Sequence, residues 1–253
     1  MIKGSLSAVL VMMALSMQFL FSQPLQEKIN QPLIIDTDCG IEDFRAVAMI
    51  LSNNAFNVQA ITISDGIVPP EIGANNITGL LKTIGRESIP TGVGKAGINT
   101  LNDRNKFHSS VKWSNDKGNT TKLEPAVSLL SDILKESDEE ITFIVMGPLT
   151  NIAELLIVYP NSVKSIRRII WYKKLPDANN FYETIDSLAA KKVLNSGIRV
   201  DIISNLGINE AVFDFSFLTG QKNTESSFSK LLLNFYSLNK IPADQFNKQI
   251  YLK

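Results

Sequence analysis

Apolar runs alternate along the chain with segments in which apolar residues recur at helical spacing. We expect strands where apolar or β-branched residues run together, over 32–35, 58–63, 89–93, 141–146, 166–172 and 199–203. We expect helices where the spacing is helical, over 44–51, 69–84, 125–134, 149–158, 186–194 and 228–238. This alternation predicts an α/β protein with a mainly parallel, Rossmann-like sheet that carries helices on both faces.

Two stretches depart from this alternation. Residues 94–123 are rich in Asn, Asp, Lys and Gly, and they predict a long loop of the kind that often covers a binding site. From about residue 213 onward the pattern weakens, and 241–253 gives no predicted element. A chain of 253 residues that is 44% hydrophobic can bury one sizeable core. We therefore expect one domain over 32–253, with a divergent or shortened C-terminal part.

The N-terminal residues follow a different pattern from the rest. Lys3 gives a basic start, residues 6–21 are mostly apolar, and the next charge is Glu27. This order is typical of an export signal, and the apolar run is short for a membrane span. We expect a signal peptide over 1–22, a periplasmic or secreted protein and no stable membrane span after cleavage. An uncleaved anchor is the alternative.

Charge and cysteine content limit the classes of ligand. Lysine plus arginine equals aspartate plus glutamate, at 25 each, so no net field draws the molecule to nucleic acid or to an anionic membrane. A small neutral ligand suits this balance. Cys39 is the only cysteine, which excludes an internal disulfide and any multi-cysteine metal site. A metal ion would be held mainly by oxygen.

Four carboxylates follow the first predicted strand within eight residues: Asp36, Asp38, Glu42 and Asp43. Their mutual repulsion is costly without a cation, and a dense set of oxygen ligands favours calcium or magnesium. A solvated helix start explains the same residues without any metal. Because ligands of parallel sheets bind beyond the carboxyl ends of the strands, we expect this acidic loop and segment 147–151 to lie together.

Two motifs resemble one known family. Residues 34–43 read Ile-Ile-Asp-Thr-Asp-Cys-Gly-Ile-Glu-Asp and resemble the Asp-Thr-Asp-Pro-Gly-Ile-Asp-Asp signature of the inosine–uridine nucleoside hydrolases. Residues 143–153 are similar to that family's strand followed by Gly-Pro-Leu-Thr-Asn-Ile-Ala. The resemblance covers roughly residues 32–203. It implies the nucleoside hydrolase fold and cleavage of N-glycosidic bonds in ribonucleosides, in which calcium holds the ribose hydroxyls and the attacking water.

The resemblance also implies roles for individual residues. Carried across by motif, Asp38 becomes a calcium ligand and the general base, and Asp43 becomes a bidentate calcium ligand. Met146 would contribute its backbone carbonyl to the same ion. These roles suit the chemistry, because a metal lowers the pKa of water and nearby carboxylates stabilise an oxocarbenium-like transition state.

The expected substrate contacts come from positions where this sequence departs from the family. Glu42 stands in place of the aspartate that contacts the ribose, and Asn180 and Tyr182 fall on the family's Glu-Phe-Asn triplet. Ile67 replaces an asparagine that would hydrogen-bond the ribose. The implied partner is a small nucleoside or ribosyl substrate, and association of identical copies stays open.

Two further departures concern histidine. The family's C-terminal His-Asp has no counterpart after residue 203, and Asp214 and Asp244 lack matching neighbours. The only histidine, His108, lies in the predicted loop 94–123, where a surface residue is more common than a catalyst. The resemblance leaves open that His108 sits near the family's own loop histidine.

Two alternative functions remain open. Because of these departures, the chain could be a non-catalytic relative that binds nucleosides or sugars. A strand followed by Asp-Thr-Asp also resembles phosphatases that use an aspartyl nucleophile. That interpretation fits less well, because Gly40 and Ile41 stand where those enzymes carry threonine or valine.

Overall fold

A computed structural model of the chain describes residues 31–97, 103–121, 123–172, 185–203, 217 and 220–240. The predicted signal peptide and the expected substrate contacts Asn180 and Tyr182 lie outside these ranges. None of the helices described is both long enough and apolar enough to cross a lipid bilayer.

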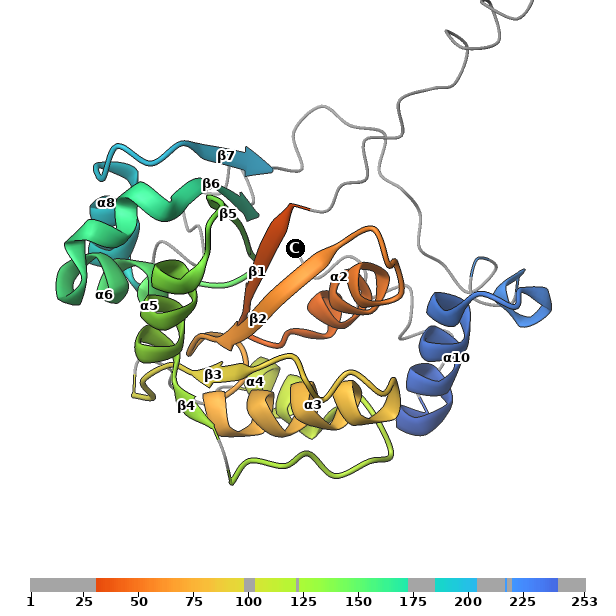
Figure 1. The fold of residues 1–253 in the computed structure, drawn as a ribbon. Helices are drawn as coiled ribbons and strands as arrows, with labels where there is room; N and C mark the ends of the chain where they lie inside the picture. Colours follow the sequence, from red (N-terminus) through yellow and green to blue (C-terminus); the bar gives the residue numbers. More distant parts are fainter. Residues whose placement is uncertain are drawn as a thin grey trace, which may run out of the picture. The chain divides into compact units, whose positions relative to one another are not determined.

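Within these ranges, seven parallel strands form a single sheet in the order β4-β3-β2-β1-β5-β6-β7 (Figure 1). Their bounds are β1 Pro32–Thr37, β2 Asn57–Ile63, β3 Thr91–Val93, β4 Glu124–Pro125, β5 Ile141–Val145, β6 Ile166–Tyr172 and β7 Val200–Ile203. The expected parallel α/β sheet is confirmed. From β1 the chain adds strands on one side up to β4 and then returns to add β5 on the other side. The carboxyl ends of β1 and β5 therefore lie at the switch point where such sheets bind ligands.

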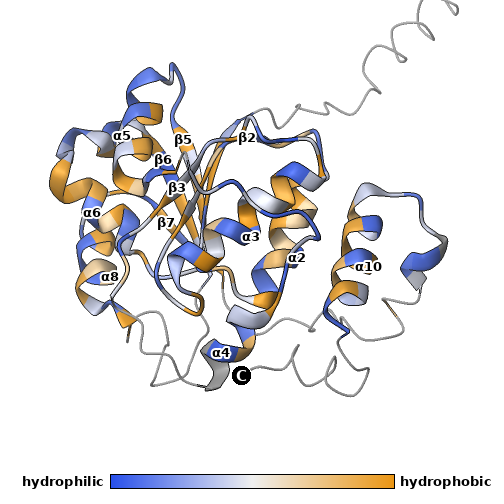
Figure 2. Cartoon of the chain, turned by 90° about the horizontal axis from the view of Figure 1, so that it is seen from below, coloured by the Kyte–Doolittle hydropathy of each residue, from blue (hydrophilic) through white to orange (hydrophobic). Residues whose placement is uncertain are grey.

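Helices cover both faces of this sheet. Figure 2 shows α5, α6 and α8 on one side and α2, α3 and α10 on the other. The bounds are α2 Ile41–Leu51, α3 Pro70–Thr83, α4 Asp103–Ser110, α5 Ala126–Glu136, α6 Thr150–Val158, α8 Ser187–Leu194 and α10 Ser227–Asn239. Two short 3-10 helices, η1 Pro160–Ser165 and η2 Gln221–Asn223, complete the elements described.

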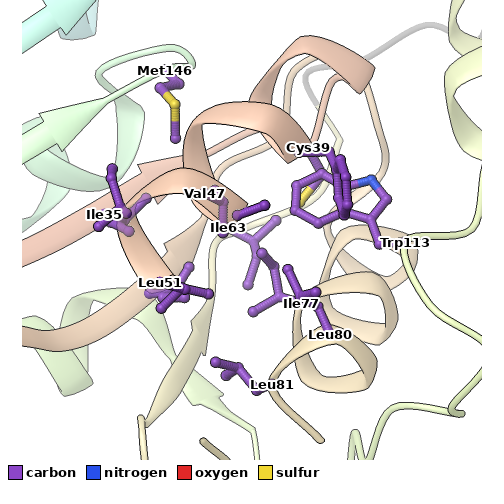
Figure 3. Close-up of a cluster of buried hydrophobic side chains, with 14 of the residues drawn as sticks. Ile35, Cys39, Val47, Leu51, Ile63, Ile77, Leu80, Leu81, Trp113 and Met146 are labelled. Atoms are coloured by element: carbon purple, nitrogen blue, oxygen red, sulfur yellow. The ribbon is translucent and has the colours of Figure 1, made fainter. Parts of the chain in front are cut away.

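Alternation of side chains along β1 divides the core between the two faces. Leu33 and Ile35 pack in one hydrophobic cluster with α2, α3 and α10, whereas Ile34 packs in a second cluster with α5, α6 and α8. Figure 3 shows part of the first cluster, with side chains from β1, α2, β2 and α3. Burial of both faces explains why the strands read as continuous apolar runs.

The predicted C-terminal helix is present as α10, and it packs against α2. The rings of Phe44 and Phe235 stack with centroids 4.0 Å apart, and Trp113 meets Phe44 edge-on at 5.4 Å. The side chain of Asn239 also accepts a hydrogen bond from the N–H of Lys112 at 2.9 Å. Aromatic packing therefore fastens the last described helix to the helix that carries the acidic residues.

Several sequence-based boundaries differ from the structure: β4 was not expected, and two further differences concern the helices next to the acidic loop. The predicted loop 94–123 contains helix α4, whose sequence Asp-Arg-Asn-Lys-Phe-His-Ser-Ser has one large apolar residue and no amphipathic period. Helix α2 begins at Ile41 rather than at Phe44, because Glu42 and Asp43 belong to its first turn. Acidic residues are favourable in that turn, where they face the positive end of the helix dipole.

Candidate metal and sugar site at the end of the central strands

Backbone hydrogen bonds bring the two family-like motifs together at the carboxyl end of the sheet. The N–H of Met146, directly after β5, donates to the carbonyl of Asp36 at 2.9 Å. The side-chain amide of Asn151, in the first turn of α6, donates to Oδ2 of Asp36 at 2.8 Å. The acidic loop and segment 147–151 are therefore neighbours in space.

Asp38 lies fully enclosed at the centre of this region. Its Oδ2 accepts a hydrogen bond from the N–H of Ile67 at 2.9 Å. Within the described ranges, its Oδ1 is also buried and has no hydrogen-bond partner. Two glycines leave space for this side chain. A Cβ on Gly66 would lie 2.2 Å from Asp38 Oδ2, and a Cβ on Gly147 would lie 3.1 Å from Asp38 Cβ. One carboxylate oxygen thus remains available for another ligand.

Asp43 lies in the first turn of α2 and is also buried. Its Oδ2 accepts a hydrogen bond of 2.6 Å from the hydroxyl of Thr37, and that hydroxyl accepts one of 2.9 Å from the N–H of Cys39. Thr37 therefore holds the loop and the helix start together. This contact fixes the position of the Asp43 carboxylate relative to Asp38.

The backbone of Cys39 adopts a left-handed conformation with φ of 58°. Proline, which the family signature carries at this position, is locked near −65° and cannot adopt it. Burial, followed by the nearby charges of Asp43 and Asp38, raises the pKa of the Cys39 thiol well above its usual range. A buried thiol that stays protonated is a poor nucleophile.

The buried carboxyl groups of Asp38 and Asp43 repel each other, and Glu42 adds to this repulsion. Burial raises the pKa of Asp38 to about 7; the Ile67 N–H opposes this shift, and the charge of Glu42 adds to it. Burial, and then the charges of Asp38 and Glu42, raise the pKa of Asp43 well above its usual range. Neighbouring N–H and O–H donors are therefore too few to stabilise both charges, and a cation would relieve the repulsion.

This electrostatic strain predicts the pH dependence of stability when no metal is added. The pKa of Asp38 is about 7 in the fold, against an ordinary value of 3.8. Its protonation therefore contributes stability that is complete below about pH 4 and is lost as the pH rises through about 7. We expect the free energy of unfolding in a metal chelator, measured with urea, to fall between pH 5 and pH 8. Asp38→Asn should flatten that fall, and an equally steep fall in this variant would contradict the assignment.

The oxygen donors fit a hard cation as part of a coordination shell. Asp38 and Asp43 offer carboxylate oxygens, and Met146, directly after β5, precedes Gly147, which packs closely against Asp38. In the ranges that the structure describes, no group of three or more His, Cys, Asp or Glu side chains is arranged to hold a metal ion. The buried carboxylates of Asp38 and Asp43 are oxygen donors of the kind that a hard cation such as calcium takes.

Of the expected substrate contacts, Glu42 is the one that the structure describes, and it lies at the rim of the site. Its side chain folds over Gly40, where a Cβ would lie 2.9 Å from the Glu42 Cδ. The side chain remains about one third exposed, at 36%. Ile67, which replaces a family asparagine, is fully buried in the first hydrophobic cluster. Ile67 contacts the site through its backbone N–H, which donates to Asp38, and not through its side chain.

His108 is buried, so its expected place on the surface is wrong. Helix α4 brings it against the start of α2, where Nδ1 accepts a hydrogen bond of 3.1 Å from the N–H of Ile41. Glu42 Oε2 lies 4.0 Å from the same nitrogen. His108 therefore caps α2 from outside the helix, at an end where Gly40 has no side chain to do so. Sequence reasoning missed this role because 67 residues separate donor and acceptor.

This contact can be tested through stability. His108→Ala removes the acceptor of the Ile41 N–H and should lower the free energy of unfolding by about 1–2 kcal/mol, the usual effect of losing a helix cap. His108→Asn places an amide oxygen where Nδ1 stood and should recover part of the loss. Urea denaturation at pH 7 measures both variants, and equal losses in the two would show that the cap is unimportant.

Asp36, which the sequence marked as one of four acidic residues, has a different setting from Asp38 and Asp43. Its Oδ2 accepts hydrogen bonds from the Thr62 hydroxyl at 2.6 Å and from the amide of Asn151 at 2.8 Å. Burial raises its pKa to about 6, and these two donors oppose the shift. These two hydrogen bonds hold the Asp36 carboxylate in place between β2 and the start of α6.

Known proteins of one family resemble this chain. RihA of Shewanella woodyi, a pyrimidine-specific ribonucleoside hydrolase, is 30% identical over 183 residues, which are 68% of this chain and 59% of that protein. RihC of Klebsiella pneumoniae, a non-specific ribonucleoside hydrolase, is 31% identical over 180 residues, or 67% of this chain and 59% of that protein. The chain thus spans about 59% of the length of these two relatives.

A solved structure and a family-wide sequence model agree with this similarity. The structure of an inosine-uridine preferring nucleoside hydrolase from Bacillus anthracis matches with a TM-score of 0.70, covering 82% of this chain and 76% of that one. At 16% identity, this match supports the fold alone. The sequence model of the inosine-uridine preferring nucleoside hydrolases matches residues 33–247. The chain therefore belongs to the inosine-uridine preferring nucleoside hydrolase family.

Proposed function

We propose that the chain hydrolyses the N-glycosidic bond of ribonucleosides with the help of a bound calcium ion. The observation that carries this proposal is Asp38, a buried carboxylate at the switch point of the sheet. One of its oxygens is fixed by the Ile67 N–H, and the other has no partner in the described part of the chain. Family membership adds the reaction class, since the two relatives above are named ribonucleoside hydrolases.

Calcium would be held by Asp38, Asp43 and the backbone carbonyl of Met146. When bound, it supplies Lewis acidity that lowers the pKa of a water molecule and makes it a better nucleophile. The buried oxygens of the two aspartates support this assignment, because their charges otherwise repel each other without compensation. Calcium commonly takes such mixed sets of carboxylate and carbonyl oxygens.

The residues of the chain have distinct roles in the reaction. Asp38 accepts the proton of the attacking water in this proposal, since its Oδ1 has no hydrogen-bond partner in the described part of the chain. The remaining carboxylates stabilise positive charge as it develops on the ribose ring in the transition state. Glu42, at the rim of the site, is the proposed contact of the ribose hydroxyls. Asn180 and Tyr182 are proposed as further substrate contacts.

Release of reducing sugar provides the direct test. The purified chain is incubated with uridine, cytidine, inosine and adenosine, in calcium and separately in the chelator EGTA. We expect ribose to appear with at least one nucleoside in calcium, and its rate to fall in EGTA. No release from any of the four nucleosides would contradict the proposed activity, and an equal rate in EGTA would contradict the role of calcium.

A second candidate function is nucleoside or sugar binding without hydrolysis. It is favoured by Ile67, whose side chain lies in the core where the family carries a polar ribose contact. Calorimetric titration with the same nucleosides separates the two functions. Heat of binding together with no release of ribose supports the binding protein, whereas turnover supports the hydrolase.

We also propose that the protein is exported, so that hydrolysis takes place in the periplasm or outside the cell. Lys3 and the apolar run 6–21 support this proposal. The test is N-terminal sequencing of protein recovered from the periplasm or the medium, where we expect a start near residue 23. Full-length protein in the cytoplasm would contradict export.

A further inference from the structure

Asp36 occupies a core position of the central strand. Along β1 its side chain lies on the same face as Ile34, which packs in the second hydrophobic cluster against α5, α6 and α8. It pairs with Thr62 of β2 on one side and with Val145 of β5 on the other. Packing alone would favour an apolar side chain at such a place, because burial of a carboxylate is costly.

The polar contacts of Asp36 join three elements. One carboxylate oxygen, Oδ2, accepts hydrogen bonds from Thr62 on β2 at 2.6 Å and from Asn151 on α6 at 2.8 Å. The residue itself is only 1% exposed. Among the residues described, its second oxygen has no hydrogen-bond partner. Both bonds go to the same oxygen, so the side chain connects β1 with β2 and with the start of α6.

Asn151 extends this connection to a fourth element. A Cβ on Gly94, directly after β3, would lie 2.4 Å from Oδ1 of Asn151 and 2.7 Å from the carbonyl of Ile63. The backbone after β3 therefore fits closely against the Asn151 amide, and only glycine allows this approach. The carboxyl ends of β1, β2 and β3 and the start of α6 meet around one buried side-chain pair, Asp36 and Asn151.

The same residue also links the two halves of the proposed metal site. The backbone carbonyl of Asp36 accepts the hydrogen bond of the Met146 N–H at 2.9 Å, and Asp38 follows two residues later in the chain. We propose that Asp36 is a positioning residue, which holds the acidic loop and segment 146–151 at a fixed separation. The consequence for calcium rests on the proposed function, whereas the mechanical role does not.

Hydrogen exchange measured by mass spectrometry tests the mechanical role without calcium or substrate. In Asp36→Ala, we expect the amides of 37–43 and 146–152 to exchange about tenfold faster or more, because the donors of Thr62 and Asn151 lose their acceptor. Ile34→Ala is the matched control on the same strand and face. It should lower the midpoint of thermal unfolding yet leave both segments within about threefold of the wild-type rate.

A reciprocal exchange of the two side chains provides the rescue test. Asn151→Asp alone places two carboxylates in contact and should speed exchange in both segments. Combined with Asp36→Asn, it restores an amide–carboxylate pair with donor and acceptor reversed, and exchange should return to within about threefold of wild type. If Asp36→Ala does not fold, Asn151→Ala is compared with wild type instead, because it removes the same hydrogen bond between residues 36 and 151.

Three results would overturn the positioning role: unchanged exchange in Asp36→Ala, equal acceleration in Ile34→Ala, or no rescue by the exchanged pair. Titration of calcium onto the folded variants then tests the link to the site. We expect Asp36→Ala to bind calcium at least about tenfold more weakly than wild type, whereas Ile34→Ala binds normally. If wild type itself binds no calcium while the exchange results hold, the proposed function fails and the positioning role stands.

Discussion

Replacing Asp38 with asparagine is expected to abolish release of ribose and, at the same time, to stabilise the chain when no metal is present. Asparagine retains the shape of the side chain and an oxygen for the Ile67 N–H, but it cannot accept a proton from water. Loss of a general base typically slows a reaction by about 10²–10⁴-fold. Loss of one calcium ligand adds to this effect, so we expect turnover to fall by about 10³-fold or more.

The gain in stability follows from the repulsion between the buried carboxyl groups when no metal is added. Burial and the neighbouring carboxyls raise the pKa of Asp38 to about 7, so that ionisation at pH 8 opposes folding. An amide carries no charge, and its N–H₂ group can donate to Asp43. We expect the free energy of unfolding in EGTA at pH 8 to rise by on the order of 2 kcal/mol. The gain should shrink at pH 5, where Asp38 is already protonated.

Asp201→Asn is the matched control for this substitution. Asp201 lies on β7 and pairs at the surface with Arg199 at 2.9 Å and Arg168 at 3.4 Å. Pairs of this kind contribute little to stability, so this variant should match wild type in both measurements to within about 1 kcal/mol and twofold in rate. Lower stability of Asp38→Asn in EGTA at pH 8 would refute the assignment of Asp38 as an uncompensated charge.

The sheet was predictable from the sequence because its strands are buried on both faces. The run 141–146 is apolar at every position but Thr142, and 166–172 is apolar except for two arginines; each reappears as a strand within one residue of its expected bounds. The same rule fails for α4. Its sequence is mostly polar, and its burial depends on Phe107 and His108 meeting residues far along the chain. Hydrophobic periodicity predicts an element only where that element has a continuous apolar face of its own.

The site was predictable where its residues are close in sequence. The acidic residues 36–43 and the segment 147–151 were found because each is a local motif at the end of a strand. The contact of His108 with Ile41 and the bond between Asp36 and Asn151 could not be found in this way. The partners are 67 residues apart in the first case and 115 in the second. The left-handed backbone at Cys39 was equally hidden, because cysteine itself gives no signal of positive φ.

Gly66→Ala is expected to damage stability and activity together by displacing Asp38. A Cβ at this position would lie 2.2 Å from Oδ2, 2.6 Å from Cβ and 2.8 Å from Cγ of Asp38, all closer than van der Waals contact allows. The carboxylate has to move, and it then loses the hydrogen bond from the Ile67 N–H. We expect a loss of about 3 kcal/mol in the free energy of unfolding. A displaced base of this kind typically slows turnover by about 10²-fold.

A control substitution at another glycine and a double-mutant cycle distinguish the clash with Asp38 from a general effect of replacing glycine by alanine. Gly220 has φ of −59°, and a Cβ there would meet no atom within 4 Å, so Gly220→Ala should leave stability and turnover at wild-type values or slightly raise stability. The three nearest neighbours of the added Cβ at Gly66 all belong to the Asp38 side chain. In an Asp38→Gly background, Gly66→Ala should therefore cost little, which gives a coupling energy of about 2 kcal/mol. An additive cycle would mean that the alanine collides with something other than Asp38.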